Sequence, residues 1–267
     1  MKRLLLPLAT CALAGLVIAD RMSRVVSTSL SAAPPPPADT VRDAASIRAD
    51  RPSPAAPPVA PAPSASRTPT VDRLARLAVR QQLAQAAGET YLDSLIATTD
   101  SVLRRWPDRA QAPLGVAILE GGAPGYSPRL AGLVRQALAR WNEAGVGVQL
   151  EEVADTAGAD IMVRWIDRFE FDRAGQTDLT WDQLGRVRRA TLSLALRTNS
   201  GVALGDNALL AVALHEVGHA LGLPHSADSG DVMFPSTRTT RLSERDIRSA
   251  AVLYRLPHGP VKDLATQ

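Results

Sequence analysis

The sequence predicts an α+β fold, with a twisted mixed sheet and helices packed on it, over residues 107–257. In this region short apolar runs alternate with longer stretches whose apolar residues recur every three or four positions, a mixture typical of strands and helices in one domain. Hydrophobic residues make up 45% of the 267 residues, which is enough to form a core. All ten aromatic residues lie at Tyr91 or later, so we expect the core to exclude the N-terminal part of the chain.

The first 33 residues have the pattern of an export segment. Lys2 and Arg3 precede an apolar run over residues 4–19, as in a signal peptide. The run is shorter than the roughly 20 residues of a membrane span, but its small-residue cleavage sites are badly placed, so an uncleaved N-terminal membrane anchor is the alternative. Cys11 lies in a weak lipobox-like context that would instead allow lipidation. Each alternative predicts an extracytoplasmic protein that is secreted, periplasmic or membrane-anchored.

A linker and a helical segment separate this N-terminus from the domain. Eleven of the twenty prolines lie within residues 34–70, which predicts a disordered, Pro/Ala-rich linker. Residues 71–106 show helical spacing of apolar residues, and over 92–106 this spacing predicts a helix that stops at Pro107. We expect residues 71–106 to be either a pro-segment-like region or helices that pack beside the domain. Residues 258–267 are predicted to be a C-terminal tail.

The domain is predicted to begin with a strand, a helix and two further strands. Residues 113–119 form a short apolar run between a proline and a pair of glycines, which suits a buried strand. A helix with proline at its first position follows over residues 127–145 and ends at a glycine. Apolar runs over residues 146–153 and 159–165 predict the next two strands.

Two alternating strands and two helices complete the predicted domain. Polar and apolar residues alternate over 176–181 and 190–196, as in half-buried strands. A strongly apolar stretch over residues 207–222 predicts a buried helix. The last helix begins at Ser243, where Asp246 provides an approximate capping box, and runs to residue 254.

Charge and cysteine content exclude several classes of function. The net charge is +3, but the arginines are scattered among acidic residues and no basic stripe with interleaved aromatics occurs, so we expect no nucleic-acid binding. Cys11 is the single cysteine, which excludes a disulfide, a thiolate metal site and a cysteine nucleophile in the folded part. Any metal there must be held by histidines and carboxylates. We expect the chain to be monomeric.

Three of the four histidines lie within residues 215–225, which read His-Glu-Val-Gly-His-Ala-Leu-Gly-Leu-Pro-His. On a helix, His215 and His219 lie one turn apart on the same face, with β-carbons about 5–6 Å apart, so both imidazoles can bind one zinc ion. Gly222 can take the left-handed conformation that ends a helix, and the returning chain would bring His225 to the same ion. Three protein ligands leave a fourth position for water, as in catalytic zinc sites.

Glu216 follows the first histidine and therefore points beside the metal. A carboxylate in this place can take a proton from a zinc-activated water, whose pKa the metal lowers to roughly 7. The water then attacks a carbonyl polarised by zinc, and Glu216 passes its proton to the leaving amine. Glu216 is thus the predicted catalytic base of a zinc-dependent endopeptidase whose substrates are proteins or peptides.

Residues 215–225 resemble the extended zinc signature of the metzincin metallopeptidases, and specifically of the matrixins. Ser226 follows the third histidine as it commonly does in matrixins, and Asp231-Val232-Met233-Phe234-Pro235 resembles their Met-turn. Residues 242–247 resemble the start of the matrixin C-terminal helix. The resemblance covers most of residues 107–257 and implies the zincin-like catalytic domain of the metzincins, with a long active-site helix and a C-terminal helix beside the mixed sheet.

The resemblance also implies roles for single residues. Met233 would pack under the three imidazoles as a hydrophobic floor, although its type fits plain core equally well. Astacins and serralysins carry a tyrosine ligand just after this methionine, where this sequence has Phe234 and Pro235, which favours the matrixin branch. Phe234 and Pro235 would line the pocket beside the scissile bond, or form only a turn. A substrate would lie extended along an edge strand that contains Thr177 and Leu179.

Two features of matrixins are missing from this sequence. Matrixins usually stay latent through a pro-segment cysteine that caps the zinc, and no cysteine follows Cys11. Vertebrate matrixins carry a second, structural zinc site built on several histidines, and only His258 remains here, so we expect one zinc ion. Four aspartates could supply calcium ligands, without a clear calcium-binding motif: Asp155, Asp160, Asp172 and Asp178.

The predicted function is that of an exported zinc endopeptidase. The alternative is a membrane-tethered peptide-binding module whose metallopeptidase site is degenerate or covered by residues 71–106. The intact Glu216 argues against degeneracy, because a pure binding site needs no base there.

Overall fold

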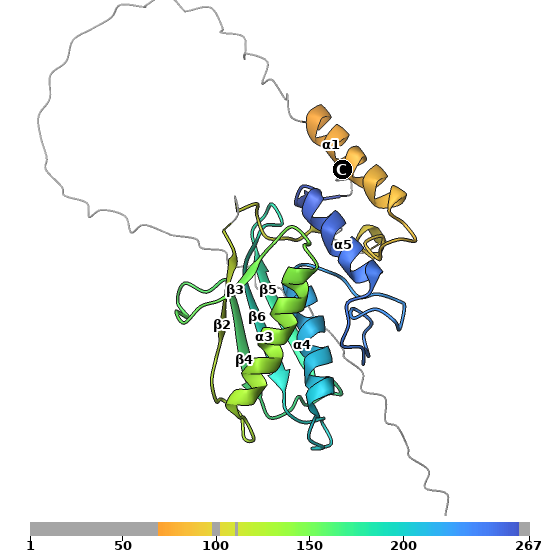
Figure 1. The fold of residues 1–267 in the computed structure, drawn as a ribbon. Coiled ribbons are helices and arrows are strands. Elements are labelled where there is room, and N and C mark those ends of the chain that lie inside the picture. Colours follow the sequence, from red (N-terminus) through yellow and green to blue (C-terminus); the bar gives the residue numbers. More distant parts are fainter. Residues whose placement is uncertain (1–68, 98–101, 110–111, 262–267) are drawn as a thin grey trace, which may run out of the picture.

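The computed structural model describes residues 69–97, 102–109 and 112–261 (Figure 1). The predictions for residues 1–33 and for the linker up to residue 68 fall outside these ranges. The described chain contains a five-stranded sheet of order β3-β2-β4-β6-β5. Its strands are β2 (Leu114–Ile118), β3 (Leu150–Glu152), β4 (Ile161–Ile166), β5 (Gly175–Trp181) and β6 (Val187–Ala195). Neighbouring strands run parallel except β5, which pairs antiparallel with β6 at the edge of the sheet.

Two helices, α3 (Pro128–Glu143) and α4 (Asp206–Ala220), lie side by side on one face of this sheet (Figure 1). Gly145 follows the end of α3 with a φ of 63°, in the left-handed conformation predicted for the helix end. Trp141 of α3 is 1% exposed, and its indole Nε1 donates to the carbonyl of Leu214 in α4 at 3.0 Å. Packing and this hydrogen bond together hold α4 against α3.

Helix α4 is buried on nearly all sides. Every residue from Leu209 to Ala220 is buried, as expected of a helix that is hydrophobic all round. His215, Glu216 and His219 are the polar exceptions in this stretch. Because burying such groups without partners is costly, their presence indicates a specific chemical role.

The helical segment before the sheet shares the core of the domain. Helix α1 (Pro69–Gln85) and the single turn α2 (Ser94–Ala97) precede the sheet, and α1 lies beyond α5 (Glu244–Arg255), on the side away from the sheet (Figure 1). The segment contributes these buried side chains to the core: Val79, Leu83, Tyr91, Leu92, Leu103 and Trp106. Residues 69–97 and 102–109 therefore pack beside the domain as part of the same folded unit.

The helix predicted over residues 92–106 is wrong where the structure describes it. Only α2 is helical there, and β1 (Val102–Leu103) pairs antiparallel with β7 (Gly259–Pro260). Leu92 and Leu103 are fully buried, so the apolar spacing reflects burial in extended and turn structure, which the sequence pattern alone does not distinguish from a helix. The pairing of β7 also makes the first residues of the predicted tail part of the fold.

The predicted strand over residues 146–153 is shortened to β3. Gly147 has a φ of 95°, and Leu150 is the first residue of the strand. The amide of Asn142 pairs with the backbone N–H and carbonyl of Leu150, both at 2.8 Å, and fixes where β3 begins.

The α+β fold itself is confirmed, and the other predicted strands and helices lie within a few residues of their expected ranges. Ser243 and Asp246 form the predicted capping box at the start of α5. In the ranges that the structure describes, no helix has the length and apolar character needed to cross a membrane.

Candidate functional site

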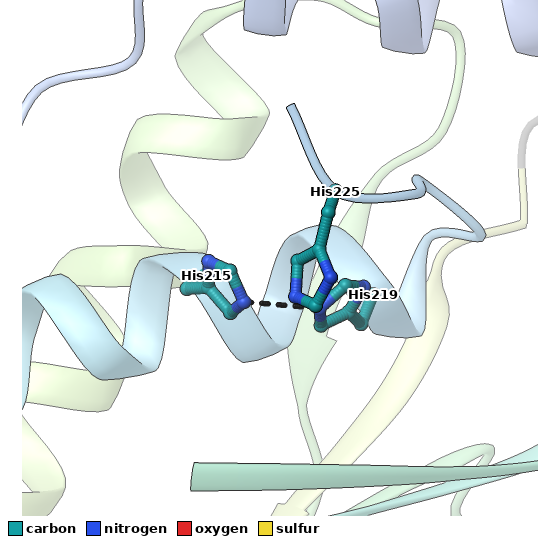
Figure 2. Close-up of side chains that lie close together, drawn as sticks. All are labelled: His215, His219 and His225. Carbon is teal, nitrogen blue, oxygen red and sulfur yellow. Dashed lines mark hydrogen bonds between the residues drawn. The ribbon is translucent and has the colours of Figure 1, made fainter. Parts of the chain in front are cut away.

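The last turns of α4 and the loop after it bring three histidines together. His215 and His219 project from the same face of α4, as their spacing predicted (Figure 2). Gly222 ends the helix with a φ of 96°, and a β-carbon there would overlap the carbonyl oxygen of Arg104. The chain then turns back and carries His225 to the other two rings (Figure 2).

The ring nitrogens of these histidines converge on one point. The Nε2 atom of His219 lies 3.0 Å from Nε2 of His215 and 3.2 Å from Nε2 of His225. One ligand atom from each histidine lies within 4.8 Å of the others, so among the described residues this group could hold a metal ion. Two nitrogens bound tetrahedrally to one zinc ion at about 2.0–2.1 Å would lie about 3.3 Å apart, close to the observed spacing.

Backbone carbonyls set the tautomers of two of the rings. Nδ1 of His215 lies 2.8 Å from the carbonyl oxygen of Val232, and Nδ1 of His219 lies 2.8 Å from that of Leu223. A carbonyl oxygen only accepts, so Nδ1 carries the hydrogen in both rings. In the neutral rings Nε2 then presents a lone pair, and two lone pairs at 3.0 Å repel unless a cation lies between them. The donor set thus fits zinc.

Burial keeps these imidazoles in the neutral form that metal binding requires. Burial, followed by the nearby charge of His219, lowers the pKa of His215 well below its ordinary value. Burial likewise lowers the pKa of His219 to about 4. Both rings are therefore uncharged near neutral pH, with one N–H each.

Glu216 is held by a threonine of the edge strand. Its side chain is 1% exposed, and the hydroxyl of Thr177 in β5 donates to its Oε2 at 2.7 Å. The same hydroxyl lies 3.0 Å from the backbone carbonyl oxygen of Glu216. This contact fixes the carboxylate of the residue that follows His215.

A glycine makes room for this carboxylate. Gly175, the first residue of β5, faces Glu216, and a β-carbon at this position would overlap Oε1 and the carboxyl carbon. The strand can therefore approach α4 this closely only because residue 175 has no side chain.

Met233 lies directly against α4. It is fully buried, and a β-carbon at Gly218, between the two helical histidines, would overlap its sulfur. The backbone carbonyl of Met233 accepts from the N–H of Ser226 at 2.8 Å, which ties the loop after His225 to the methionine. Met233 therefore packs against α4 between His215 and His219, and its role as a floor beneath the imidazoles stays a prediction.

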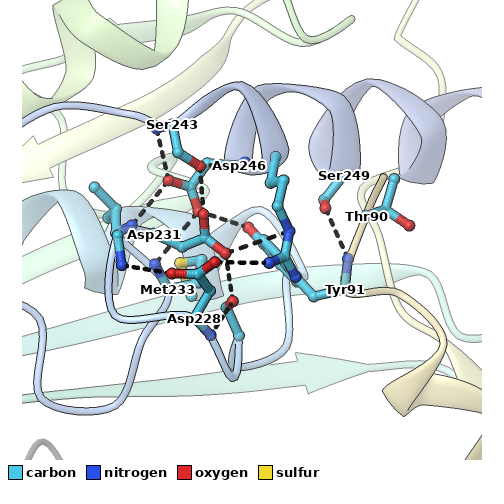
Figure 3. A network of polar contacts seen from close by, with 12 residues as sticks. Thr90, Tyr91, Asp228, Asp231, Met233, Ser243, Asp246 and Ser249 are labelled. Atoms are coloured by element: carbon cyan, nitrogen blue, oxygen red, sulfur yellow. Dashed lines mark hydrogen bonds and ion pairs between the residues drawn. The ribbon is translucent and has the colours of Figure 1, made fainter. Parts of the chain in front are cut away.

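Two buried aspartates hold the loop that carries Met233 (Figure 3). Asp231 accepts from the hydroxyls of Ser226 and Ser243. Asp246 at the start of α5 accepts from the backbone N–H of Val232 at 2.8 Å and that of Met233 at 3.4 Å. Sequence reasoning assigned Asp246 only a helix-capping role, and the capping box was the one signal that pointed to it.

The residues predicted to contact substrate lie in β5 and in the turn after Met233. Thr177 and Leu179 are 1% and 2% exposed, so their side chains point inward and β5 offers a ligand mainly its backbone. Phe234 and Pro235 are half-buried in the turn after Met233, where the N–H of Phe234 donates to the carbonyl of Asp231 at 3.2 Å. The contact of Thr177 with Glu216 was missed, because it joins residues 39 positions apart.

Three of the four aspartates considered as calcium ligands make other polar contacts. Asp160 pairs bidentately with the guanidinium of Arg109, at 2.7 and 2.5 Å, and Asp155 accepts from the N–H of Ala157 at 2.9 Å. Asp178 accepts from the amide of Gln176 at 2.9 Å. Calcium binding stays an untested hypothesis.

Comparison with known proteins agrees with this geometry. Residues 127–255 match the family model described as Matrixin. Matrilysin of Felis catus is 46% identical over 63 residues, which are 22% of this chain and 24% of that protein. Interstitial collagenase of Equus caballus is 39% identical over 62 residues, 22% of this chain and 13% of that protein. Matrix metalloproteinase-15 of Homo sapiens is 39% identical over 77 residues, 26% of this chain and 12% of that protein.

These matches span a quarter or less of the length of the three relatives, so they concern the domain and not those whole proteins. The family match covers α3, the sheet from β3 to β6, α4 and α5, and it includes the three histidines, Glu216 and Met233. Residues 127–255 therefore form a matrixin-type metallopeptidase catalytic domain.

Proposed function

We propose that this chain is an exported zinc endopeptidase that hydrolyses peptide bonds in proteins or peptides. His215, His219 and His225 would hold the zinc ion, and Glu216 would act as the general base. The observation that carries the proposal is the convergence of the three Nε2 atoms next to a carboxylate that Thr177 holds in place. The membership of the domain in the matrixin family supports it.

Glu216 and Thr177 would have different roles in the reaction. When bound, zinc supplies a Lewis acid that activates water and polarises the carbonyl of the scissile bond. Oε2 of Glu216 is fixed by the hydroxyl of Thr177. Oε1 would then take the proton from the attacking water and deliver it to the leaving nitrogen as the C–N bond breaks.

The substrate would bind along the edge of the sheet. Within the described sheet β5 has a strand neighbour only on the β6 side, so its other edge can pair with an extended peptide through backbone groups. Leu179 would support this strand from the core, and Phe234 and Pro235 would line the pocket beside the scissile bond. We expect the enzyme to work as a monomer.

We also propose that the domain acts outside the cytoplasm. The positive charges of Lys2 and Arg3 before an apolar run support export, by a cleaved signal or by an N-terminal anchor. Fractionation of expressing cells tests this, with the protein expected in the periplasmic, secreted or membrane fraction. Recovery in the cytoplasm alone would contradict it.

A peptidase assay on the full-length chain tests the activity. Zinc-loaded protein is incubated with casein and with quenched fluorescent peptides, and Glu216→Ala is compared with the wild type. Glu151→Ala is the matched control, because Glu151 lies exposed on β3. We expect the wild type and Glu151→Ala to cleave equally and Glu216→Ala to lose activity by a factor of about 10² or more.

Equal activity of Glu216→Ala and the wild type would contradict the role of the base. A wild type that binds zinc and peptide without cleaving would instead favour the peptide-binding module with a covered or degenerate site.

A further inference from the structure

We propose that Tyr91 is a positioning residue for the metal centre. Tyr91 acts on the ring of His215 through Asp246 and through the peptide group that joins Val232 to Met233. The inference deepens the proposed function, because it rests on the same zinc site. It concerns a segment that precedes the matrixin match of residues 127–255.

Tyr91 is anchored firmly on the C-terminal helix. It is 3% exposed, its hydroxyl donates to Oδ1 of Asp246 at 3.0 Å, and its backbone N–H donates to the hydroxyl of Ser249 at 3.2 Å (Figure 3). Glu89 adds an ion pair with Arg248 at 3.4 Å. Burial, together with the charge of Asp246, raises the pKa of Tyr91 well above its ordinary value, so the hydroxyl stays protonated and donates.

Asp246 forms hydrogen bonds both with Tyr91 and with the loop that carries Met233. Its side chain is fully buried, and a buried carboxylate must be satisfied by donors. Oδ2 accepts from the N–H of Val232 and from the N–H of Ser243, both at 2.8 Å. Oδ1 accepts from the hydroxyl of Tyr91 and from the N–H of Met233. Tyr91 therefore supplies a donor that helps fix the orientation of the carboxylate.

One peptide group connects Asp246 to the zinc-binding ring. The carbonyl of Val232 and the N–H of Met233 belong to the same planar peptide unit. The N–H faces Oδ1 of Asp246 at 3.4 Å, the oxygen that Tyr91 also contacts, and the carbonyl oxygen lies 2.8 Å from Nδ1 of His215. A rotation of Asp246 would turn this peptide unit, and the ring of His215 would lose its fixed tautomer and orientation.

This path gives residues 69–97 a supporting role. The segment packs on α5 and adds one hydrogen bond to a network that ends at a metal ligand, so it would strengthen the site. A pro-segment that merely covers the site would act in the opposite direction, and its loss would leave the metal affinity intact.

Zinc affinity of two single variants of the full-length chain tests the proposal. Tyr91→Phe removes only the hydroxyl, and Ser249→Ala removes only the other anchor of Tyr91, without touching Asp246. The dissociation constant for zinc is measured by competition with a chromophoric chelator. Hydrogen exchange of the Val232 and Met233 amides is followed in metal-free protein.

We expect Tyr91→Phe to raise the dissociation constant about threefold to tenfold, somewhat less than the roughly tenfold to hundredfold effect of losing a direct partner of a metal ligand. Exchange of the Val232 and Met233 amides should be faster in this variant. Ser249→Ala should leave the zinc affinity within about twofold of the wild type, while both variants lower the melting temperature.

Two results would overturn the inference: unchanged zinc affinity in Tyr91→Phe, or an equal loss of affinity in both variants. Neither measurement uses peptide cleavage. A wild type that binds zinc but cleaves nothing would therefore refute the proposed activity and leave this inference standing, whereas an active wild type with an unaffected Tyr91→Phe would refute this inference alone.

Discussion

The hydroxyl of Thr177 lies 2.7 Å from Oε2 of Glu216 and thereby joins the edge strand of the sheet to α4, the helix that carries His215 and His219. The contact is buried, since Thr177 and Glu216 are each 1% exposed. The strand proposed to bind the substrate thus also holds the carboxylate proposed as the base, so one element would set the positions of both.

Removal of this hydroxyl should slow the chemical step without weakening substrate binding. Thr177→Val keeps the shape of the side chain but leaves Oε2 of Glu216 without this donor, and we expect kcat to fall about tenfold to a hundredfold. KM should change little, because the side chain faces the core. Steady-state kinetics on a quenched peptide measure both. Thr177→Ser, which keeps the hydroxyl, should recover most of kcat, and a serine variant as slow as the valine variant would count against the contact.

The glycine that faces Glu216 should be equally sensitive. In Gly175→Ala the added β-carbon would overlap Oε1, so the carboxylate or the strand must move, and we expect kcat/KM to fall by a factor of about 10². Gly132→Ala in α3 is the matched control, because a β-carbon there meets nothing within 4 Å. The control should keep full activity and gain stability of up to about 1 kcal/mol, as alanine favours a helix. Full activity of Gly175→Ala would show that the carboxylate needs no such room.

The convergence of the three histidines could be predicted from the sequence because the relevant spacing is local. His215 and His219 share a helix face, and Gly222 allows the turn that returns His225, so eleven residues define the site. The partners of these residues could not be predicted in the same way. Thr177 contacts Glu216 across 39 positions and Tyr91 contacts Asp246 across 155, and no local pattern encodes such pairs.

The fold, too, could be predicted only where the sequence signal is local. Helices α3 and α5 follow from apolar periodicity with proline, glycine and capping signals at their ends, and α4 follows from a long apolar stretch that ends at Gly222. The helical spacing of Leu92, Leu103 and Trp106 predicted a helix over residues 92–106. In the structure these three side chains are buried against other elements, and their backbone is irregular or extended. Apolar spacing reports burial, and only tertiary contacts decide the backbone conformation of a short segment.

Metal binding should stabilise the folded domain. A ligand that binds only the folded state at a thousand times its dissociation constant adds about 4.1 kcal/mol to the free energy of unfolding. We expect added zinc to raise the melting temperature of chelator-treated wild-type protein in a thermal unfolding assay. His225→Ala removes one of the three ligands and should show a much smaller rise. An equal rise in both proteins would place the bound zinc elsewhere.

The turn between β5 and β6 should make stability depend on pH. Asp182 accepts from the N–H groups of Leu184 and Arg186 and from the guanidinium groups of Arg186 and Arg188. Burial alone would raise the pKa of Asp182, but the hydrogen bonds from Arg188 and Arg186 hold it well below the ordinary value. The folded carboxyl is thus more acidic than the unfolded one, so its stabilising effect is present above about pH 4 and is lost as the pH falls further.

Urea unfolding of metal-free Asp182→Asn and wild-type protein checks this sign. The wild type should be the more stable at pH 7, and the difference in free energy of unfolding should shrink at pH 3. A difference that stays constant with pH would mean that the charge of Asp182 contributes nothing to the turn.

Anomalous diffraction at the zinc absorption edge, from crystals of the zinc-loaded chain, tests the metal centre most directly. We expect one strong peak at about 2.0–2.1 Å from Nε2 of His215, His219 and His225, with no fourth protein ligand. The absence of a peak between the three rings, or a peak ligated by other side chains, would contradict the assignment of this site.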